Sequence, residues 1–165
     1  MNHVADNTAA RDRILSLVAQ LTDAQMAIPS DDGWTIGAEL AHLTFWDRVH
    51  TGRLRAALGA GGDLPAPFPS GAAEAINNAG LQGWRLIGGG AAIQWFAEAS
   101  REVDAYLASL DPSVVDRIRS AGLPRLVERY RHRTDHGDAI ELNRPGFDGD
   151  PESCHQAAAV ASAWR

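Results

Sequence analysis

The sequence contains no lysine and only one cysteine, Cys154. All 15 basic residues are therefore arginines, which excludes Schiff-base catalysis and the lysine of a phosphate-binding P-loop. A single cysteine excludes a disulfide within the chain, so we expect a reducing, cytoplasmic setting. No base stands at a recognisable spacing from Cys154, and we therefore do not expect it to act as a nucleophile.

Long apolar runs and an excess of positive charge are also missing. No apolar run approaches the ~20 residues that a membrane span requires, and the start of the chain holds no apolar segment typical of a signal peptide. Acidic residues outnumber basic ones by 21 to 15, so the formal net charge is −6. This balance is not that of a nucleic-acid-binding protein. We therefore expect neither a nucleic acid nor a membrane as partner.

Apolar residues recur with helical spacing in four long segments, and no segment alternates as a strand would. Asp6 or Asn7 is a candidate cap for the first helix, and Thr35 for the second. The sequence predicts an all-α fold, an antiparallel four-helix bundle in a single domain over residues 1–165. Its core is expected over about residues 8–142 and a short tail over 143–165. The predicted long helices cover residues 8–24, 35–58, 91–110 and 123–142.

The segments between these helices are rich in glycine and proline. Glycines at 59, 61 and 62, followed by prolines up to Pro69, predict a long loop after the second helix. Residues 72–86 have a partly helical pattern that glycines interrupt. Asp111–Pro112 resembles a cap followed by proline at the first helical position, and so predicts a short helix.

Two of the six histidines, His132 and His136, lie four residues apart on a predicted helix. This spacing places both side chains on one face of the helix, with a rise of about 6 Å between their Cα atoms. Two imidazoles so arranged can bind one metal ion. The flanking residues are very polar, so the spacing alone fits two solvated surface histidines as well.

A third histidine ligand has two candidates, His42 and His50. His42 lies in an otherwise apolar stretch, 40–46, and fits either a core histidine or a ligand. A bundle that presents it opposite the histidine pair would bring three nitrogens together and leave a coordination position open. His50 lies about 12 Å further along the helix axis, so the two cannot readily bind one ion. Periodicity does not decide between them.

The residues around these histidines resemble two motifs of the DinB-like superfamily of metal-binding four-helix bundles. Residues 33–43, GWTIGAELAHL, with an aromatic residue at Trp46, resemble the signature of the second helix of that family. Residues 131–136, RHRTDH, resemble its histidine pair near the end of the last helix.

This resemblance implies that His42, His132 and His136 hold a divalent metal ion, commonly zinc or nickel. It therefore favours His42 over His50 as the third ligand. Gly137, directly after the histidine pair, is not the residue type that we would expect there. Glycine has a low helix propensity, whereas a metal site needs a rigid helix to hold its ligands.

The family includes mycothiol-dependent maleylpyruvate isomerases and bacillithiol transferases. The resemblance thus implies a thiol-dependent S-transferase or isomerase that acts on a small molecule with a low-molecular-weight thiol as co-substrate. Two alternatives stay open. One is a non-catalytic stress-response or small-molecule-binding protein, and the other is a metal-dependent hydrolase.

Several charged residues close to the histidines in sequence are candidates for further roles. Glu39, Asp47 and Asp135 could transfer a proton, and Arg131 and Arg133 could bind a carboxylate substrate. The sequence favours a solvated surface position for each of the five.

Two acids are placed to orient an imidazole. Glu39 comes one helical turn before His42, and Glu128 one turn before His132. Both could instead pair with arginines at the surface.

We also expect a homodimer, because bundles of this kind often pair along exposed helix faces. Phe45 and Val49 point away from the predicted core face of the second helix and are candidates for that contact.

Overall fold

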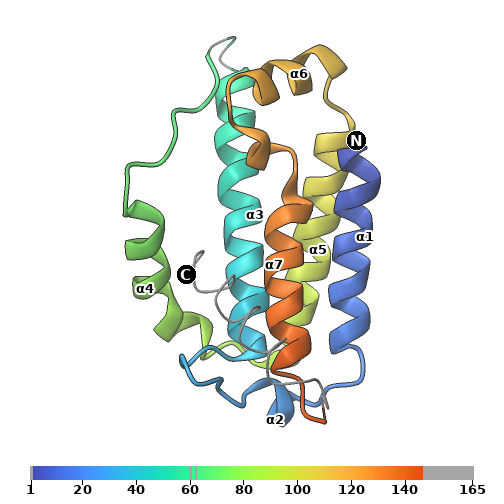
Figure 1. The fold of residues 1–165 in the computed structure, drawn as a ribbon, viewed down its shortest axis with the longest axis vertical. Coiled ribbons are helices and arrows are strands. Elements are labelled where there is room, and N and C mark those ends of the chain that lie inside the picture. The colour runs from blue at the N-terminus through green and yellow to red at the C-terminus, as the bar shows by residue number, and fades with distance from the viewer. Residues whose placement is uncertain (1, 60, 62, 147–165) are drawn as a thin grey trace.

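The computed structural model describes residues 2–59, 61 and 63–146. All secondary-structure elements assigned within these residues are helices (Figure 1). The all-α prediction is therefore confirmed. Among the described residues, no helix is both long and apolar enough to cross a membrane. The helices are α1 (His3–Val18), α2 (Asp23–Met26), α3 (Ile36–Gly59), α4 (Ala72–Trp84), α5 (Gly89–Ala108), α6 (Pro112–Ser120), a short 3-10 helix (Pro124–Leu126) and α7 (Arg129–Leu142).

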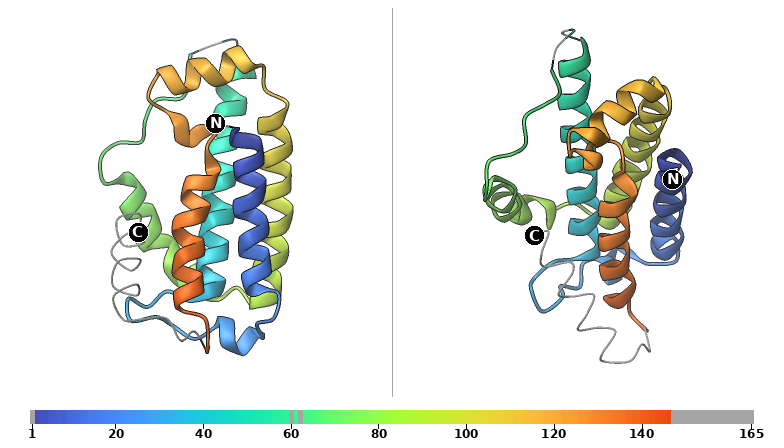
Figure 2. Two further views of the ribbon diagram at one scale, coloured as in Figure 1. Left: turned by 45° about the vertical axis from the view of Figure 1, so that its right-hand side comes forward. Right: turned by 45° about the horizontal axis from the view of Figure 1, so that its top comes forward.

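The four long helices α1, α3, α5 and α7 pack along one another (Figures 1 and 2). In the views, α1 and α7 run in one direction and α3 and α5 in the other. The helix α1 packs against α7 and α5, and α3 packs against α5 and α7. Two packed pairs, α1 with α7 and α3 with α5, are therefore parallel. The antiparallel arrangement expected from the sequence describes only the pairs α1 with α5 and α3 with α7.

A parallel pair of helices needs a long connection, because the chain must return to the end at which the first helix began. Between α3 and α5, the loop after Gly59 and the helix α4 make this connection on the outside of the bundle (Figure 2). The indole Nε1–H of Trp46 on α3 donates to Oδ1 of Asn77 on α4 at 2.8 Å. Gly80 lets the Trp84 ring lie against the helix, since a Cβ there would come within 2.5 Å of that ring.

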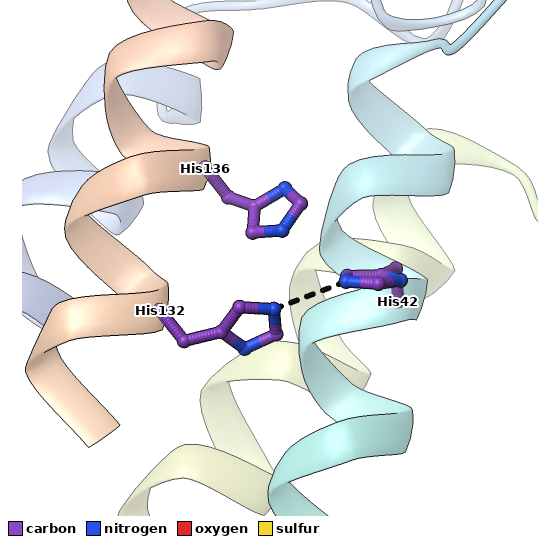
Figure 3. A group of neighbouring side chains, drawn as sticks. All are labelled: His42, His132 and His136. Carbon is purple, nitrogen blue, oxygen red and sulfur yellow. Dashed lines mark hydrogen bonds between the residues drawn. The ribbon is translucent and has the colours of Figure 1, made fainter. Parts of the chain in front are cut away.

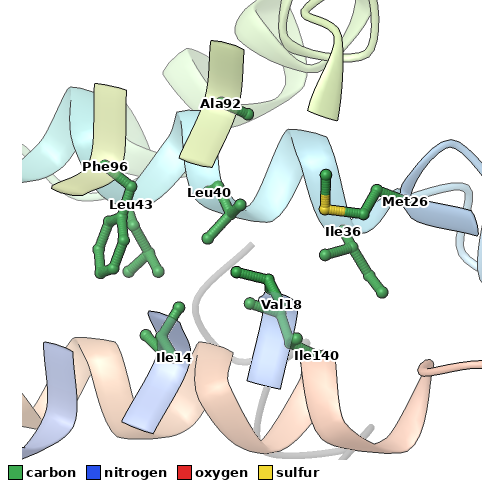
Figure 4. Packing of buried hydrophobic residues seen from close by; sticks show 9 residues of the cluster. All are labelled: Ile14, Val18, Met26, Ile36, Leu40, Leu43, Ala92, Phe96 and Ile140. Carbon is green, nitrogen blue, oxygen red and sulfur yellow. The ribbon is translucent and has the colours of Figure 1, made fainter. Parts of the chain in front are cut away.

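Two apolar clusters fill the bundle. Figure 4 shows the first, near the α2 end, where residues of α1, α3, α5 and α7 meet. The second joins α3 and α5 to α6 and the 3-10 helix. Burial of each large side chain contributes about 1.5–3 kcal/mol. The first cluster consists of Ile14, Val18, Met26, Ile36, Leu40, Leu43, Ala92, Phe96 and Ile140. The second consists of Leu54, Val103, Leu107, Val115, Ile118, Leu126 and Val127.

Helix boundaries differ from the prediction mainly at three ends. The first helix begins at His3, because Asn2 caps it by accepting from the backbone N–H groups of Val4 and Ala5. It ends at Val18, and a capping box starts α2 as a separate helix. The last helix begins only at Arg129, after the 3-10 helix.

The predicted cap of the second helix is confirmed, since Thr35 Oγ1 accepts from the N–H of Ala38 at 3.1 Å. The predicted tail lies outside the described residues from residue 147 onward, as does Cys154.

Asn7, expected as a cap for its own helix, instead caps α7. Its side chain is fully buried in the middle of α1. Its Oδ1 accepts from the N–H of Tyr130 at 2.8 Å, and its Nδ2 donates to the carbonyl of Val127 at 2.9 Å. The residue before α7, Glu128, makes no side-chain cap bond of its own. Asn7 thus satisfies backbone groups at the start of the helix that carries the histidine pair.

Replacing Asn7 by alanine is therefore expected to lower the free energy of unfolding by about 2–4 kcal/mol, because two buried backbone groups lose their partner. Urea unfolding followed by circular dichroism measures this loss. The Asn7→Asp variant separates the two bonds only in part, since it keeps the acceptor for Tyr130 but replaces the donor by a carboxylate oxygen facing the Val127 carbonyl. Unchanged stability in the alanine variant would contradict the capping role.

Candidate metal centre

The structure brings together three histidines that are far apart in sequence. His42 projects from α3, and His132 and His136 project from α7. Figure 3 shows their rings turned toward one another between the two helices. The Nε2 atoms of His42 and His132 lie 3.1 Å apart, and one ring nitrogen of each histidine lies within 4.8 Å of those of the other two. These three side chains could hold a metal ion.

His136 is held in the orientation that a metal ligand needs. Its Nδ1 lies 2.5 Å from Oε2 of Glu39, a buried carboxylate on α3. A carboxylate accepts, so the proton of a neutral His136 lies on Nδ1, and Nε2 keeps its lone pair. That Nε2 is buried and has no hydrogen-bond partner among the described residues. An orphaned acceptor in this position is what a bound cation would satisfy.

His132 has the opposite arrangement. Arg129 Nη2 lies 3.1 Å from Nδ1 of His132, and a guanidinium has donors only, so Nδ1 is the acceptor. The proton of a neutral His132 then lies on Nε2, facing His42. Metal binding through Nε2 therefore requires the other neutral tautomer of His132, with its proton on Nδ1 and the Arg129 contact released.

The surroundings keep His42 and His132 neutral. Burial lowers the pKa of His42 well below its ordinary value, and the neighbouring His136 and Arg129 lower it further. Burial, followed by His136, His42 and Arg129, has the same effect on the pKa of His132. Aromatic rings surround His42, with the ring centres of Trp34 and Trp84 each 5.2 Å away. Neutral imidazoles are the form that binds metal.

The free energy of unfolding, measured with a chelator present, is therefore expected to fall as the pH falls below about 6.5. Below that pH the unfolded chain takes up protons on histidines that stay neutral in the folded protein. The free energy of unfolding therefore has its full value above about pH 6.5 and decreases as the pH falls further. The slope is about 1.4 kcal/mol per pH unit for each such histidine.

Urea unfolding between pH 7.5 and 5 tests this expectation. The His42→Asn variant serves as control, because its profile should be flatter than that of the wild type. Identical slopes for the two proteins would contradict a buried, neutral His42.

A cavity of about 380 Å³ lies beside the cluster, and His132 forms part of its wall. Trp46 and His50 of α3, Phe68 of the long loop and Asn77 of α4 also line it. His42 and His136 are buried, whereas His132 is only half-buried. The cluster therefore meets the cavity through His132.

A buried ion network lies behind the cluster. Asp47 is completely buried and accepts from Arg129 Nε and from Arg133 Nη2, each at 2.7 Å. Arg133 also donates to Asp104 on α5 at 2.7 Å and to the carbonyl of Asn7 on α1 at 3.0 Å. Burial would raise the pKa of Asp47, but the two arginines hold it below its ordinary value. The network ties α7 to the other three long helices.

The sequence model that describes the DinB superfamily matches residues 7–143 of this chain. The chain belongs to the DinB superfamily. The matched region runs from α1 to the end of α7 and includes all three histidines. No curated protein and no solved structure matches the chain.

In this DinB protein, His42 rather than His50 joins the histidine pair. His50 lies in the cavity wall, with its ring centre 5.5 Å from that of Trp46. The described residues contain one group of three or more histidine, cysteine or acidic side chains close enough to hold an ion, and His50 is not in it.

Other predicted residues have contacts that the sequence did not indicate. Glu39 orients His136, on the facing helix, and not His42. Glu128 pairs with Arg119 at 3.0 Å and with Arg131 at 2.7 Å, and so does not orient His132.

The candidate substrate-binding arginines lie away from the cavity. Arg131 is exposed and paired with Glu128, while Arg133 is fully buried in the ion network. Neither lines the cavity. Of the candidate acids, Asp47 belongs to the same network, and Asp135 is half-buried with its pKa raised by burial.

Gly137 has a packing role in this DinB fold. A Cβ there would lie 3.2 Å from Nη1 of Arg13 and 3.3 Å from the Ile14 side chain, both on α1. The missing side chain lets α1 approach α7 next to His136. The helix propensity lost at Gly137 is thus offset by close packing.

Sequence reasoning missed the cavity and the residues that give it its charge, Arg53 and Arg125. These arginines come from α3 and from the 3-10 helix, and no local pattern distinguishes them from other arginines in the chain.

Proposed function

We propose that this DinB protein is a metal-dependent enzyme, a thiol-dependent S-transferase or isomerase that acts on a small molecule. The observation that supports this most is the contact between the histidine cluster and the cavity through His132. Three histidine ligands leave coordination positions open, as in catalytic sites. A cavity of about 380 Å³ is within the range of small-molecule sites.

His42, His132 and His136 are the proposed ligands. The unpartnered Nε2 of His136 and the neutral state of His42 and His132 fit a divalent ion. Imidazole donors suit zinc and nickel, and we propose one of these two. Such an ion supplies Lewis acidity, which favours the deprotonated form of a thiol.

The remaining steps fall to side chains of the chain itself. Glu39 fixes the tautomer of His136 through Nδ1. Trp34 and Trp84 pack edge-on against His42 and keep water from that side. The cavity holds the second reactant against His132. Orientation of two reactants in one site lowers the barrier by removing much of the entropy cost of their encounter.

Conjugate formation tests this proposal. Purified, metal-loaded protein is incubated with an electrophile and mycothiol, bacillithiol or glutathione, and conjugates are followed by mass spectrometry. We expect conjugate above the uncatalysed rate with at least one thiol, and none above that rate with His136→Ala. Saturable ligand binding without any conjugate would overturn the proposal and favour the non-catalytic alternative. Thiol-independent hydrolysis would favour the hydrolase.

A cytoplasmic location and a homodimer remain predictions. Phe45 and Val49 lie with Trp84 and Trp95 around a smaller cavity of about 200 Å³. Trp95 is 47% exposed, which agrees with a contact surface on this side.

A further inference from the structure

The cavity beside His132 has a strongly positive wall. Three arginines line it, Arg53, Arg125 and Arg129, and none of its described lining residues is an aspartate or a glutamate. A cavity lined by one sign of charge concentrates ligands of the opposite sign. The wall therefore favours an anion over a neutral molecule of the same shape.

The three arginines differ in how much of their charge is already neutralised. Arg129 is paired with Asp47 at 2.7 Å, so its charge is largely offset. Arg53 donates through Nη2 to the carbonyl of Ala66, and its guanidinium lies 4.0 Å from the centre of the Phe68 ring. Among the described residues, no carboxylate lies within ion-pair distance of Arg53. Its charge thus remains available to a ligand in the cavity.

His50 experiences the field of this wall. Burial and the charges of Arg129, Arg53 and Arg125 together lower its pKa to about 3, with burial the largest cause. Asp47 opposes them and does not cancel them. Cationic side chains on more than one element therefore face the same space.

The rest of the wall is flat and apolar. Trp46 and Phe68 pack edge to face with their ring centres 5.4 Å apart. The hydrogen bond of Trp46 to Asn77 fixes the indole plane, and Pro65 and Pro67 complete this side. Rigid aromatic and proline surfaces suit the face of an unsaturated or aromatic group.

We propose that the cavity binds a small organic carboxylate, with its charge toward Arg53 and its apolar body against Trp46 and Phe68. The carboxylate belongs either to the substrate or to the thiol co-substrate. This assignment rests on the proposed function only in naming those two sources, because the charge and shape of the wall do not depend on it.

Matched probes test the carboxylate site in the full-length protein. Benzoate and cinnamate are compared with benzamide and cinnamamide by isothermal titration calorimetry. We expect the carboxylates to bind about tenfold tighter or more, the effect of one charge-assisted hydrogen bond at a half-buried site. Equal binding of acid and amide would overturn the proposal.

Arginine variants locate the charge. Arg53→Gln is expected to lose most of the preference for carboxylates. Arg53→Lys should keep part of it, which separates the charge from the contact with Ala66. Arg55→Gln is the matched control on the same helix, since Arg55 is exposed and pairs with Glu102 at 2.9 Å outside the cavity. A preference unchanged in Arg53→Gln would overturn the proposal.

A metal-site variant separates this inference from the proposed function. In His136→Ala the carboxylate preference is expected to persist, because arginines and not an ion produce it. Its disappearance there would place the anion on the metal and overturn the inference. A preserved preference in a protein that forms no thiol conjugate would overturn the proposed function alone.

Competition assigns the source of the carboxylate. S-methylglutathione that displaces benzoate would support the carboxylate of a thiol co-substrate as the ligand. Simultaneous binding of the two would support the carboxylate of the substrate.

Discussion

The Asp47→Asn variant is expected to lose about 3–5 kcal/mol of its free energy of unfolding, the cost of breaking a buried ion pair by removing one partner. Asp47 is completely buried and offsets the charges of Arg129 and Arg133, which are also buried. Asparagine preserves the shape of the side chain but leaves excess positive charge away from water. For a domain of ordinary stability, this is a large share of the total.

Chemical unfolding at pH 7 measures this loss. Asp116→Asn is the control with the same chemical change, because Asp116 is exposed on α6. We expect that control to lie within about 0.5 kcal/mol of the wild type. If the two variants were equally stable, the network would not carry the role assigned to it.

The network also places the metal centre. Arg129 connects Asp47 to His132, and Arg133 connects α7 to Asp104 on α5 and to Asn7 on α1. Apolar contacts alone tolerate small slips of one helix along another, whereas paired charges have one favourable register. We infer that the network fixes the position of the histidine pair along the axis of α7, so that the pair lies opposite His42. Weaker metal binding in Asp47→Asn would accompany its lower stability.

The Glu39→Ala variant is expected to bind its metal about 10–100-fold more weakly than the wild type. Without the carboxylate, Nδ1 of His136 loses its partner at 2.5 Å, and the ring can turn or change tautomer. A competition titration against a coloured chelator measures the affinity. Glu39→Gln is the intermediate case, since its amide oxygen can accept the same hydrogen bond without the charge. Equal affinities in all three proteins would contradict the orienting role.

The histidine set was predictable because each member carried a local signal. The spacing of His132 and His136 placed them on one face of a helix, and the sequence around His42 resembled a family motif. Thr35 was recognised as a cap for the same reason, since the capping bond joins residues close in sequence.

The remaining features depend on contacts that no local pattern reports. Asn7 looked like a cap for its own helix, but its partners lie more than a hundred residues further along the chain. Arg133 and Asp47 looked like surface charges, because buried ions are rare and their pairing spans 86 positions. Helical periodicity shows which face of a helix is buried and not which helix covers it. The parallel packing of α3 with α5 was therefore beyond prediction, as was the cavity that α4 helps to form.

Metal content tests the central claim most directly. Wild-type protein and the variants His42→Ala, His132→Ala, His136→Ala and His50→Ala are purified alike and submitted to elemental analysis, with folding checked by circular dichroism. We predict about one divalent ion per chain in the wild type and in His50→Ala, and little or none in the other three. Folded ligand variants that retain the metal content of the wild type, or a wild type that binds no divalent ion when supplied with zinc or nickel, would contradict the account.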